Sequence, residues 1–269
     1  MIRIDDRGRV RTLTLDRPEA LNAFNEALYD ATTDALLEAG RSPTVAVVLL
    51  TGSGRAFSTG TDVRELAAGN QGQRVVGRHG FPGLIDALIE LPKPLVCAVN
   101  GLALGVGATL LAYADLVFMA ADARLRCPFT DLAVAPEAAS SYTFPLLLGR
   151  QHAAWILMSS EWLSAEECRQ AGLAWRVSEP AALLDEAGAA AQLLAAKPMA
   201  SLIECKRTMT AAWREPLAAA RRREDRAFAR LLGQPANVEA LTALAERRPP
   251  DFASVDARHP VDVAAHRED

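Results

Sequence analysis

The chain has 269 residues, of which 50% are hydrophobic and 23% charged, so it can bury a sizeable core. Its net charge of −4 argues against a nucleic-acid-binding protein, whose affinity depends on an excess of Lys and Arg. The four cysteines are widely spaced and contain no C-x-x-C pair, which indicates reduced, mostly buried thiols. The sequence shows no secretion signal and no run long enough to span a membrane, so we expect a cytoplasmic protein.

Strands alternate with helices in the first half of the chain. Residues 10–16 alternate apolar and polar side chains, as a half-buried strand does. Residues 25–39 have helical spacing, with Asn25 as the predicted N-cap and Gly40 as the stop. Continuous apolar runs, typical of strands buried on both faces, lie at 45–51 and 95–99. This alternation predicts an α/β fold with largely parallel sheets.

The composition changes toward the C-terminus, where Ala, Leu, Arg and Glu dominate. After a last strand at 173–177, three or four helices are expected over 181–248, interrupted at Pro198, Pro216 and Pro235. The mixed charges of residues 221–226 are typical of a solvated helix face. A boundary in this region divides the chain into an α/β core, residues 1–197, and a helical region, residues 198–269.

Two glycine-containing turns follow predicted strands. One runs from residue 55 to 62, and the other, residues 100–107, opens an apolar helix predicted at 106–114. A helix N-terminus presents unpaired N–H groups, and Gly60 allows the backbone to bend so that the next N–H points outward. Two such turns can converge on one oxygen and stabilise its negative charge. An ordinary strand–helix loop and close helix packing explain the same residues, so both interpretations stay open.

One carboxylate lies in an apolar, small-residue setting. Glu137 follows Pro136 and is surrounded by alanines and a valine. Desolvation in such a setting raises the pKa of a carboxyl group and makes it a better base near neutral pH. The alternative is a surface glutamate in the first turn of a helix predicted at 140–148. The residues alone leave both open.

Several other catalytic patterns are absent from the sequence. The histidines are scattered and no H-E-x-x-H motif occurs, so no metal site is expected. Because no G-x-S-x-G motif occurs, Ser140 and Ser141 are interpreted as capping or hydrogen-bonding groups. The chain has neither a complete dinucleotide fingerprint nor a P-loop.

The ordered set of segments resembles the crotonase family, also called the enoyl-CoA hydratase/isomerase family. The resemblance covers nearly the whole chain and rests on residues 17–23, 57–62, 93–101 and 163–173. It implies a spiral of β-β-α units, a C-terminal helical trimerisation region and a homotrimer or hexamer. It also implies an acyl-CoA thioester as substrate, with coenzyme A as part of that substrate and no other cofactor. Neither nucleic acid nor membrane is expected as a partner.

The resemblance further implies roles for individual residues. The N–H groups of Thr61 and Val106 are implied to form an oxyanion hole. Substrate contacts are implied for a larger set, namely Arg17, Ala20, Leu21, Thr59, Gly60, Asp62, Arg64, Gly105, Thr109 and Phe129.

Within the family, the chain departs from the hydratases. Hydratases carry two glutamates, and the matching positions here hold Thr109 and Phe129. The segments 127–132 and 136–145 are similar to the peroxisomal-type Δ3,Δ2-enoyl-CoA isomerases, in which the glutamate matching Glu137 is the single base. The resemblance therefore implies a double-bond shift by proton transfer from C2 to C4, with the thioester enolate stabilised in the oxyanion hole.

Two alternatives stay open. The first is hydration or another acyl-CoA reaction of the family that uses Asp131 or Glu65, although neither lies at a matching hydratase position. The second is a non-catalytic or RNA-binding protein of the same fold. That class calls for a lysine-rich helix, whereas the chain is acidic and residues 221–226 mix both charges.

Overall fold

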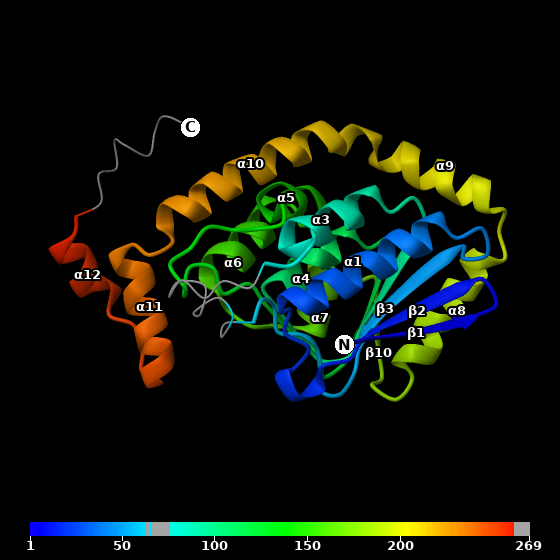
Figure 1. Ribbon diagram of the computed structural model, residues 1–269. Helices are drawn as coiled ribbons and strands as arrows, with labels where there is room; N and C mark the ends of the chain where they lie inside the picture. Colours follow the sequence, from blue (N-terminus) through cyan, green and yellow to red (C-terminus); the bar gives the residue numbers. More distant parts are fainter. Residues whose placement is uncertain (63–64, 66–75, 261–269) are drawn as a thin grey trace. The chain divides into compact units, whose positions relative to one another are not determined.

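The computed structural model describes residues 1–62, 65 and 76–260 (Figure 1). Contacts within the chain divide it into two compact units, each built from two separate stretches of sequence. Unit 1 combines residues 1–126 with 162–213, and unit 2 combines 127–161 with the part of the chain from 214 onward. These limits differ from the boundary between residues 197 and 198, which stays a prediction about functional domains.

A six-stranded sheet lies at the centre of the described part of unit 1. In spatial order its strands are β1 (Ile2–Arg7), β2 (Val10–Leu15), β3 (Val47–Gly52), β5 (Leu95–Val99), β7 (Leu116–Ala120) and β10 (Arg176–Ser178). β1 and β2 form an antiparallel hairpin, and every later pair of neighbours is parallel. All residues of β5 and nearly all of β3 are buried, which confirms two strands covered on both faces.

Unit 1 contains a second sheet, which has four strands in the described residues. Its strands are β4 (Ala56–Ser58), β6 (Leu102–Leu104), β8 (Arg124–Arg126) and β9 (Leu163–Ser164). The chain passes from the larger to the smaller sheet three times, from β3 to β4, β5 to β6 and β7 to β8. Helices α3 (Gly80–Glu90) and α4 (Val106–Thr109) follow the first two of these pairs. This order is the predicted succession of β-β-α units.

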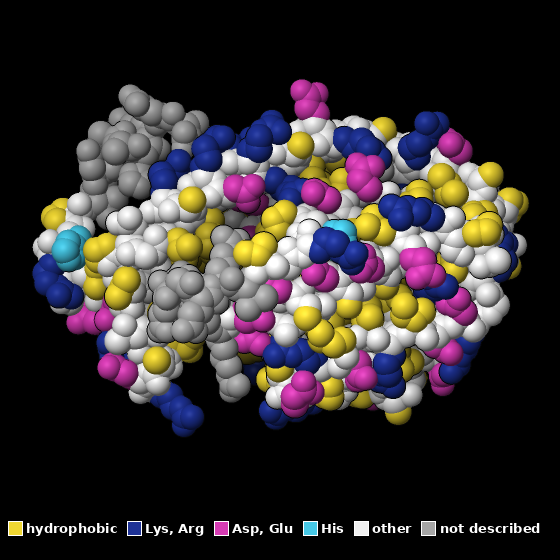
Figure 2. All heavy atoms as spheres, in the orientation of Figure 1, with side chains coloured by type: hydrophobic (Ala, Val, Ile, Leu, Met, Phe, Trp, Pro, Cys, Tyr) yellow, Lys and Arg dark blue, Asp and Glu magenta, His cyan; other side chains and the backbone are white. Residues whose placement is uncertain are grey.

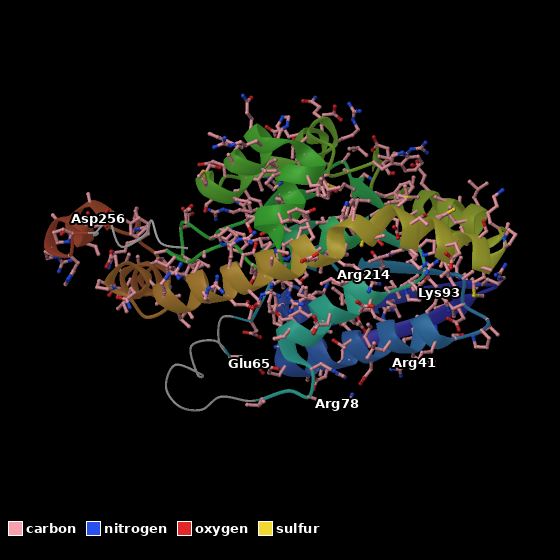
Figure 3. The ribbon with its side chains drawn as sticks, turned by 90° about the horizontal axis from the view of Figure 1, so that it is seen from above. Arg41, Glu65, Arg78, Lys93, Arg214 and Asp256 are labelled. Carbon is pink, nitrogen blue, oxygen red and sulfur yellow. The ribbon has the colours of Figure 1, made fainter. Side chains whose placement is uncertain are left out.

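Helices of unit 1 cover the large sheet. α1 (Glu26–Arg41) begins at the predicted N-cap, where the side chain of Asn25 accepts a hydrogen bond from the Leu28 N–H, 2.9 Å. α1 and α3 lie side by side (Figures 1 and 3). α8 (Leu183–Ala195) packs on β3, β5 and β7 through Ala187, Ala191 and Ala195, which repeat every four residues. α7 (Ala165–Ala171) begins with the capping box.

A buried cation ties α9 (Met199–Thr210) to the sheet. The Lys206 ammonium group donates to the Asp115 carboxylate, 2.8 Å, and to the backbone oxygen of Lys93, 3.0 Å. The same Asp115 oxygen accepts the N–H of Leu95 at the start of β5, 2.7 Å. Lys93, labelled in Figure 3, is itself buried and donates to the carbonyl of Ala39, 2.6 Å. α9 therefore belongs to unit 1, although it follows Pro198.

The regular secondary structure of unit 2 is helical in its described residues. Its helices are α5 (Ser140–Leu148), α6 (Arg150–Ser159), α10 (Arg214–Leu231), α11 (Pro235–Glu246) and α12 (Phe252–Arg258). The helix predicted at 140–148 is confirmed as α5. Pro216 does not interrupt a helix, because it lies in the first turn of α10, where a missing N–H leaves no hydrogen bond unmade.

Three other predicted limits differ from the structure. α1 continues past Gly40 to Arg41 and is capped by Ser42. The helix predicted at 106–114 is α-helical only as far as Thr109 and continues as a 3-10 helix, Leu110–Tyr113. The last strand predicted at 173–177 is β10, shifted toward the C-terminus because Leu173 and Ala174 close the end of α7 with hydrogen bonds to Cys168.

Candidate functional site

The two glycine-containing turns lie against each other in unit 1. They contain β4 and β6, which are parallel neighbours, so Gly60 and Gly105 follow their strands at the same end of the small sheet. A Cβ on Gly60 would lie 2.9 Å from the backbone oxygen of Leu104, and Gly60 has a φ of 86°. A Cβ on Gly107 would collide with the backbone oxygen of Ser58. Only glycine fits at these two positions, and its use brings the two backbones into contact.

Each turn contributes one backbone N–H that donates to no oxygen of the described residues. Around Thr61, the neighbouring groups are paired: the Phe24 N–H donates to Gly60, 2.7 Å, and the Asp62 N–H donates to Phe24, 2.8 Å. The Thr61 N–H points away from this bridge. Val106 is the first residue of α4, where an N–H has no partner inside the helix. Such a pair of donors suits an oxygen that carries negative charge.

Tyr29 fixes the first turn and was missed by sequence reasoning. Its hydroxyl group lies 2.8 Å from the hydroxyl group of Thr61, and its ring stacks on Phe24 with 4.9 Å between centroids. The side chain is buried on α1. An apolar helical position gives no sequence signal for a hydrogen bond to a distant turn.

Most of the predicted substrate-binding residues gather around the same turns. Arg17 pairs with Asp62, 2.9 Å, and donates to the carbonyl of Ala23, 2.8 Å. The Thr59 N–H donates to the carbonyl of Leu21, 3.1 Å, and Ala20 ends the 3-10 turn just before it. Gly105, with a φ of 51°, leads into Val106. Arg64 lies outside the described residues.

The two positions that match the hydratase glutamates hold no ionisable group. Thr109 is fully buried in α4, and its hydroxyl group has no hydrogen-bond partner in the described residues. Phe129 belongs to unit 2 and is almost completely buried. Of the two alternative acids, Glu65 accepts the Glu26 N–H at the start of α1, 2.8 Å (Figure 3), and Asp131 is exposed.

Glu137 lies in unit 2 on the segment that leads into α5. It is half-buried, and the next two residues, Ala138 and Ala139, both have left-handed backbones with φ of 60° and 55°. Because α5 begins only at Ser140, the alternative of a glutamate in the first helical turn is wrong. Burial in the first place, and the charge of Glu224 in the second, raise the pKa of Glu137 to about 7.

Glu224 is the other ionisable group of this region. It lies on α10, is 4% exposed, and accepts the N–H groups of Ala139, 2.6 Å, and Ser141, 2.8 Å. The prediction of a solvated face at 221–226 is therefore wrong for this residue. A signal was present in the sequence, because Leu217, Ala220 and Glu224 follow helical spacing and form one buried stripe.

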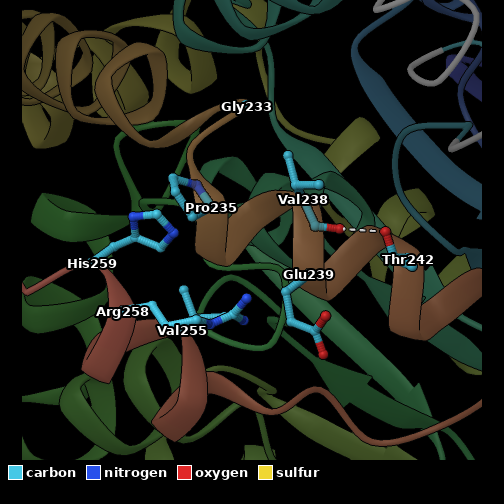
Figure 4. Close-up of a pocket in the computed structure, with 8 residues that line it drawn as sticks. All are labelled: Gly233, Pro235, Val238, Glu239, Thr242, Val255, Arg258 and His259. Atoms are coloured by element: carbon cyan, nitrogen blue, oxygen red, sulfur yellow. Dashed lines mark hydrogen bonds between the residues drawn. The ribbon is translucent and has the colours of Figure 1, made fainter.

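The described residues show few other candidate sites. A cavity of about 360 Å³ lies in unit 2, between α11 and α12, and contains none of the predicted site residues (Figure 4). No group of three His, Cys, Asp or Glu side chains in the described residues is arranged to hold a metal ion. None of the described helices is long and apolar enough to cross a membrane. On the face shown in Figure 2, basic and acidic side chains are interspersed.

Comparison with known proteins extends over nearly the whole chain. Residues 5–255 match the family model for enoyl-CoA hydratase/isomerase. The 1,2-epoxyphenylacetyl-CoA isomerase of Escherichia coli is 34% identical over 90% of this chain and 94% of its own length. Enoyl-CoA delta isomerase 2 of Rattus norvegicus is 34% identical over 65% of this chain and 46% of its own.

Solved structures of the same family also resemble the chain. The crystal structure of an enoyl-CoA hydratase from Mycobacterium marinum is 62% identical, with a TM-score of 0.75, and the match covers 77% of this chain and 98% of that one. An enoyl-CoA hydratase/isomerase from Pseudoalteromonas atlantica is 34% identical over 93% of this chain and 99% of its own, with a TM-score of 0.86. The chain has the crotonase fold and belongs to the enoyl-CoA hydratase/isomerase family of enzymes.

Proposed function

We propose that the protein is a Δ3,Δ2-enoyl-CoA isomerase with Glu137 as its single acid/base. The observation that carries this proposal is the contrast between three positions. Glu137 is a half-buried carboxyl group whose pKa is raised to about 7, while the hydratase positions hold Thr109 and Phe129. A carboxyl group with this pKa exchanges a proton readily at neutral pH.

One carboxylate is sufficient for the proposed reaction. Glu137 takes the proton from C2 of a 3-enoyl thioester, and the electrons of the C–H bond form a dienolate with the carbonyl group. Glu137 then returns the same proton to C4, and the double bond moves from C3–C4 to C2–C3. The N–H groups of Thr61 and Val106 donate to the enolate oxygen, and each such donor contributes roughly 3 kcal/mol in known oxyanion holes. Coenzyme A enters as part of the substrate, and no further cofactor is proposed.

The remaining predicted residues are proposed to bind the acyl-CoA. Arg17 and Asp62 form an ion pair beside the Thr61 turn, and Leu21 and Thr59 are joined by a hydrogen bond at the same turn. These bonds support a role in shaping the turn for the thioester. Arg64 is proposed to pair with the phosphate groups of coenzyme A, and a KM measurement on Arg64→Ala tests this role. Residues 198–269 are proposed as the oligomerisation region of a homotrimer or hexamer.

Hydration is the second candidate function. A specific observation favours it, since the M. marinum protein that is 62% identical to this chain is named an enoyl-CoA hydratase. Hydration requires one group to activate water and a partner to deliver a proton. In this chain Glu65 is already used as an acceptor at the start of α1, which leaves Asp131 as the partner to test.

The two functions are separated by assaying trans-3-hexenoyl-CoA and trans-2-hexenoyl-CoA side by side. We expect isomerisation of the first and little hydration of the second. Glu137→Gln retains size and hydrogen bonding, and it should lower kcat for isomerisation at least about a hundredfold, as removal of a general base does. Asp131→Asn is the matched control and should isomerise normally. Near-normal isomerisation by Glu137→Gln would refute the proposal, and efficient hydration that Asp131→Asn abolishes would support the second candidate.

A further inference from the structure

Glu224 is a buried charge that the proposed reaction does not use. A carboxylate removed from water is costly unless hydrogen bonds replace its hydration. Here the replacement comes from the start of α5: the N–H groups of Ala139, the residue before the helix, and of Ser141 donate to separate oxygens of Glu224, at 2.6 and 2.8 Å. The side chain of Ser141 also lowers the pKa of Glu224. Glu224 thus acts as the N-terminal cap of α5 from another helix, at the end where negative charge is favourable.

The backbone that Glu224 holds is the one that carries Glu137. Ala138 and Ala139 have φ of 60° and 55°, a left-handed conformation that costs a residue with a Cβ roughly 1 kcal/mol each. The Ser140 N–H donates to the carbonyl of Glu137 itself, 3.0 Å. The Ala139 and Ser141 amides on either side of it both end on Glu224. Without this acceptor the Ala139 and Ser141 amides lose the carboxylate that pairs them, and the left-handed turn loses two of its hydrogen bonds.

We propose that Glu224 is a positioning residue for Glu137, which holds the left-handed turn at Ala138 and Ala139 and adds a second negative charge beside the proposed base. This inference rests on the proposed function, because it assigns Glu224 to the same proton transfer. Glu224 touches the backbone of the turn and not the reacting atoms. Its role is therefore to fix the direction of the Glu137 carboxyl group and to favour the protonated form of that group.

The charged groups around Glu137 and Glu224 determine the direction in which removal of the Glu224 charge should shift the pKa of Glu137. α5, the helix packed against α10 in unit 2, carries no charged side chain. Burial is the largest cause that raises the pKa of Glu224; the hydrogen bonds from Ser141 and Ala139 lower it, and Asp225 on α10 raises it further. The charge that raises the pKa of Glu137 is that of Glu224. Removal of this charge should lower the pKa of Glu137 from about 7, and burial, the larger cause, should keep it above the ordinary value of 4.5.

The test is a carboxyl titration by NMR of the full-length protein with glutamate labelled at its side-chain carbon. The resonance that disappears in Glu137→Gln identifies Glu137. In Glu224→Gln, which keeps the length of the side chain and removes its charge, the midpoint of the Glu137 titration should fall. Glu215→Gln is the matched control, since Glu215 is an exposed glutamate of the same helix, and it should leave the midpoint unchanged. An unmoved midpoint in Glu224→Gln would overturn the inference.

Two further measurements are needed. One keeps the inference testable if Glu224→Gln folds poorly, and the other separates the role of Glu224 from the proposed function. Ser141→Ala keeps both carboxyl groups and removes one donor, so the titration midpoint of Glu224 should rise; an unchanged midpoint would overturn the inference. In kinetics, Glu224→Gln should lower kcat about tenfold to a hundredfold through misplacement of the base and move the acid limb of kcat/KM to lower pH. The NMR arms need no substrate. Normal isomerisation by Glu137→Gln would refute the proposed function, and an unmoved Glu137 midpoint would refute the role of Glu224.

Discussion

Glu137 can accept a proton only while its carboxyl group is ionised. Burial and Glu224 raise its pKa to about 7, so the ionised fraction falls as the pH drops below that value. We therefore expect kcat/KM for isomerisation to be constant above about pH 8 and to decrease about tenfold per pH unit well below pH 7. The measurement is a pH–rate profile between pH 5 and 9 at fixed ionic strength. An acid limb centred near the ordinary glutamate pKa would contradict the assignment.

Addition of one Cβ atom at Gly60 tests the turn that carries the Thr61 N–H group. In Gly60→Ala the new Cβ meets the backbone oxygen of Leu104 at 2.9 Å, and the φ of 86° is unfavourable for alanine. We expect kcat to fall about a hundredfold, as loss of one oxyanion donor does, with some loss of stability. Gly188→Ala is the matched control: nothing lies within 4 Å of its Cβ and it lies in α8. That variant should gain up to about 1 kcal/mol in urea unfolding and keep full activity.

At the scale of single elements, the ion pair of α9 differs from the exposed pairs on the same helix. Lys206 is nearly buried and is paired with Asp115, whereas Arg207 forms an exposed pair with Glu204. Lys206→Ala leaves a partly buried carboxylate without its cation, so we expect a loss of about 3 kcal/mol or more in the free energy of unfolding. Arg207→Ala should cost less than about 1 kcal/mol. Equal losses in urea titrations of the two variants would show that α9 is not anchored through Lys206.

Sequence patterns predicted the helices and strands that are determined by neighbouring residues in the chain. β3 and β5 follow from unbroken apolar runs, α1 from the Asn25 cap, and α5 from the apolar segment after Glu137. α4 was predicted too long, because an apolar run does not distinguish an α-helix from the 3-10 turn that follows Thr109.

Features of the candidate site that depend on distant contacts were harder to predict. Thr61 and Val106 belong to neighbouring turns because β4 pairs with β6. Both strands are short, and their sequences do not reveal this pairing. Glu224 was misassigned because its partners, the amides of Ala139 and Ser141, lie on another helix. The buried stripe of α10 was visible in the spacing, but the charged neighbours of Glu224 obscured it.

At the scale of the whole molecule, the proposed oligomer would cover exposed apolar side chains on the C-terminal helices. Val238 and Leu244 of α11 are more than half exposed in the single chain. We expect light scattering to give three or six times the chain mass of 28.8 kDa. Val238→Asp together with Leu244→Asp should lower that mass, whereas Leu193→Asp, at a more exposed leucine of α8, should not. A monomeric wild-type protein would refute the expected oligomer.

The hydrogen bonds that Glu224 accepts also imply an order of events during biosynthesis. Ala139 and its acceptor are 85 residues apart in sequence, and Ser141 and the same acceptor are 83 apart. While the nascent chain leaves the ribosome, residues 137–141 are made long before the carboxylate that holds their turn. The proposed base therefore gains its final geometry only after α10 has emerged, when all of unit 1 has already been synthesised. A chain that is released before residue 224 would keep the sequence of its proposed base but not the turn that orients it.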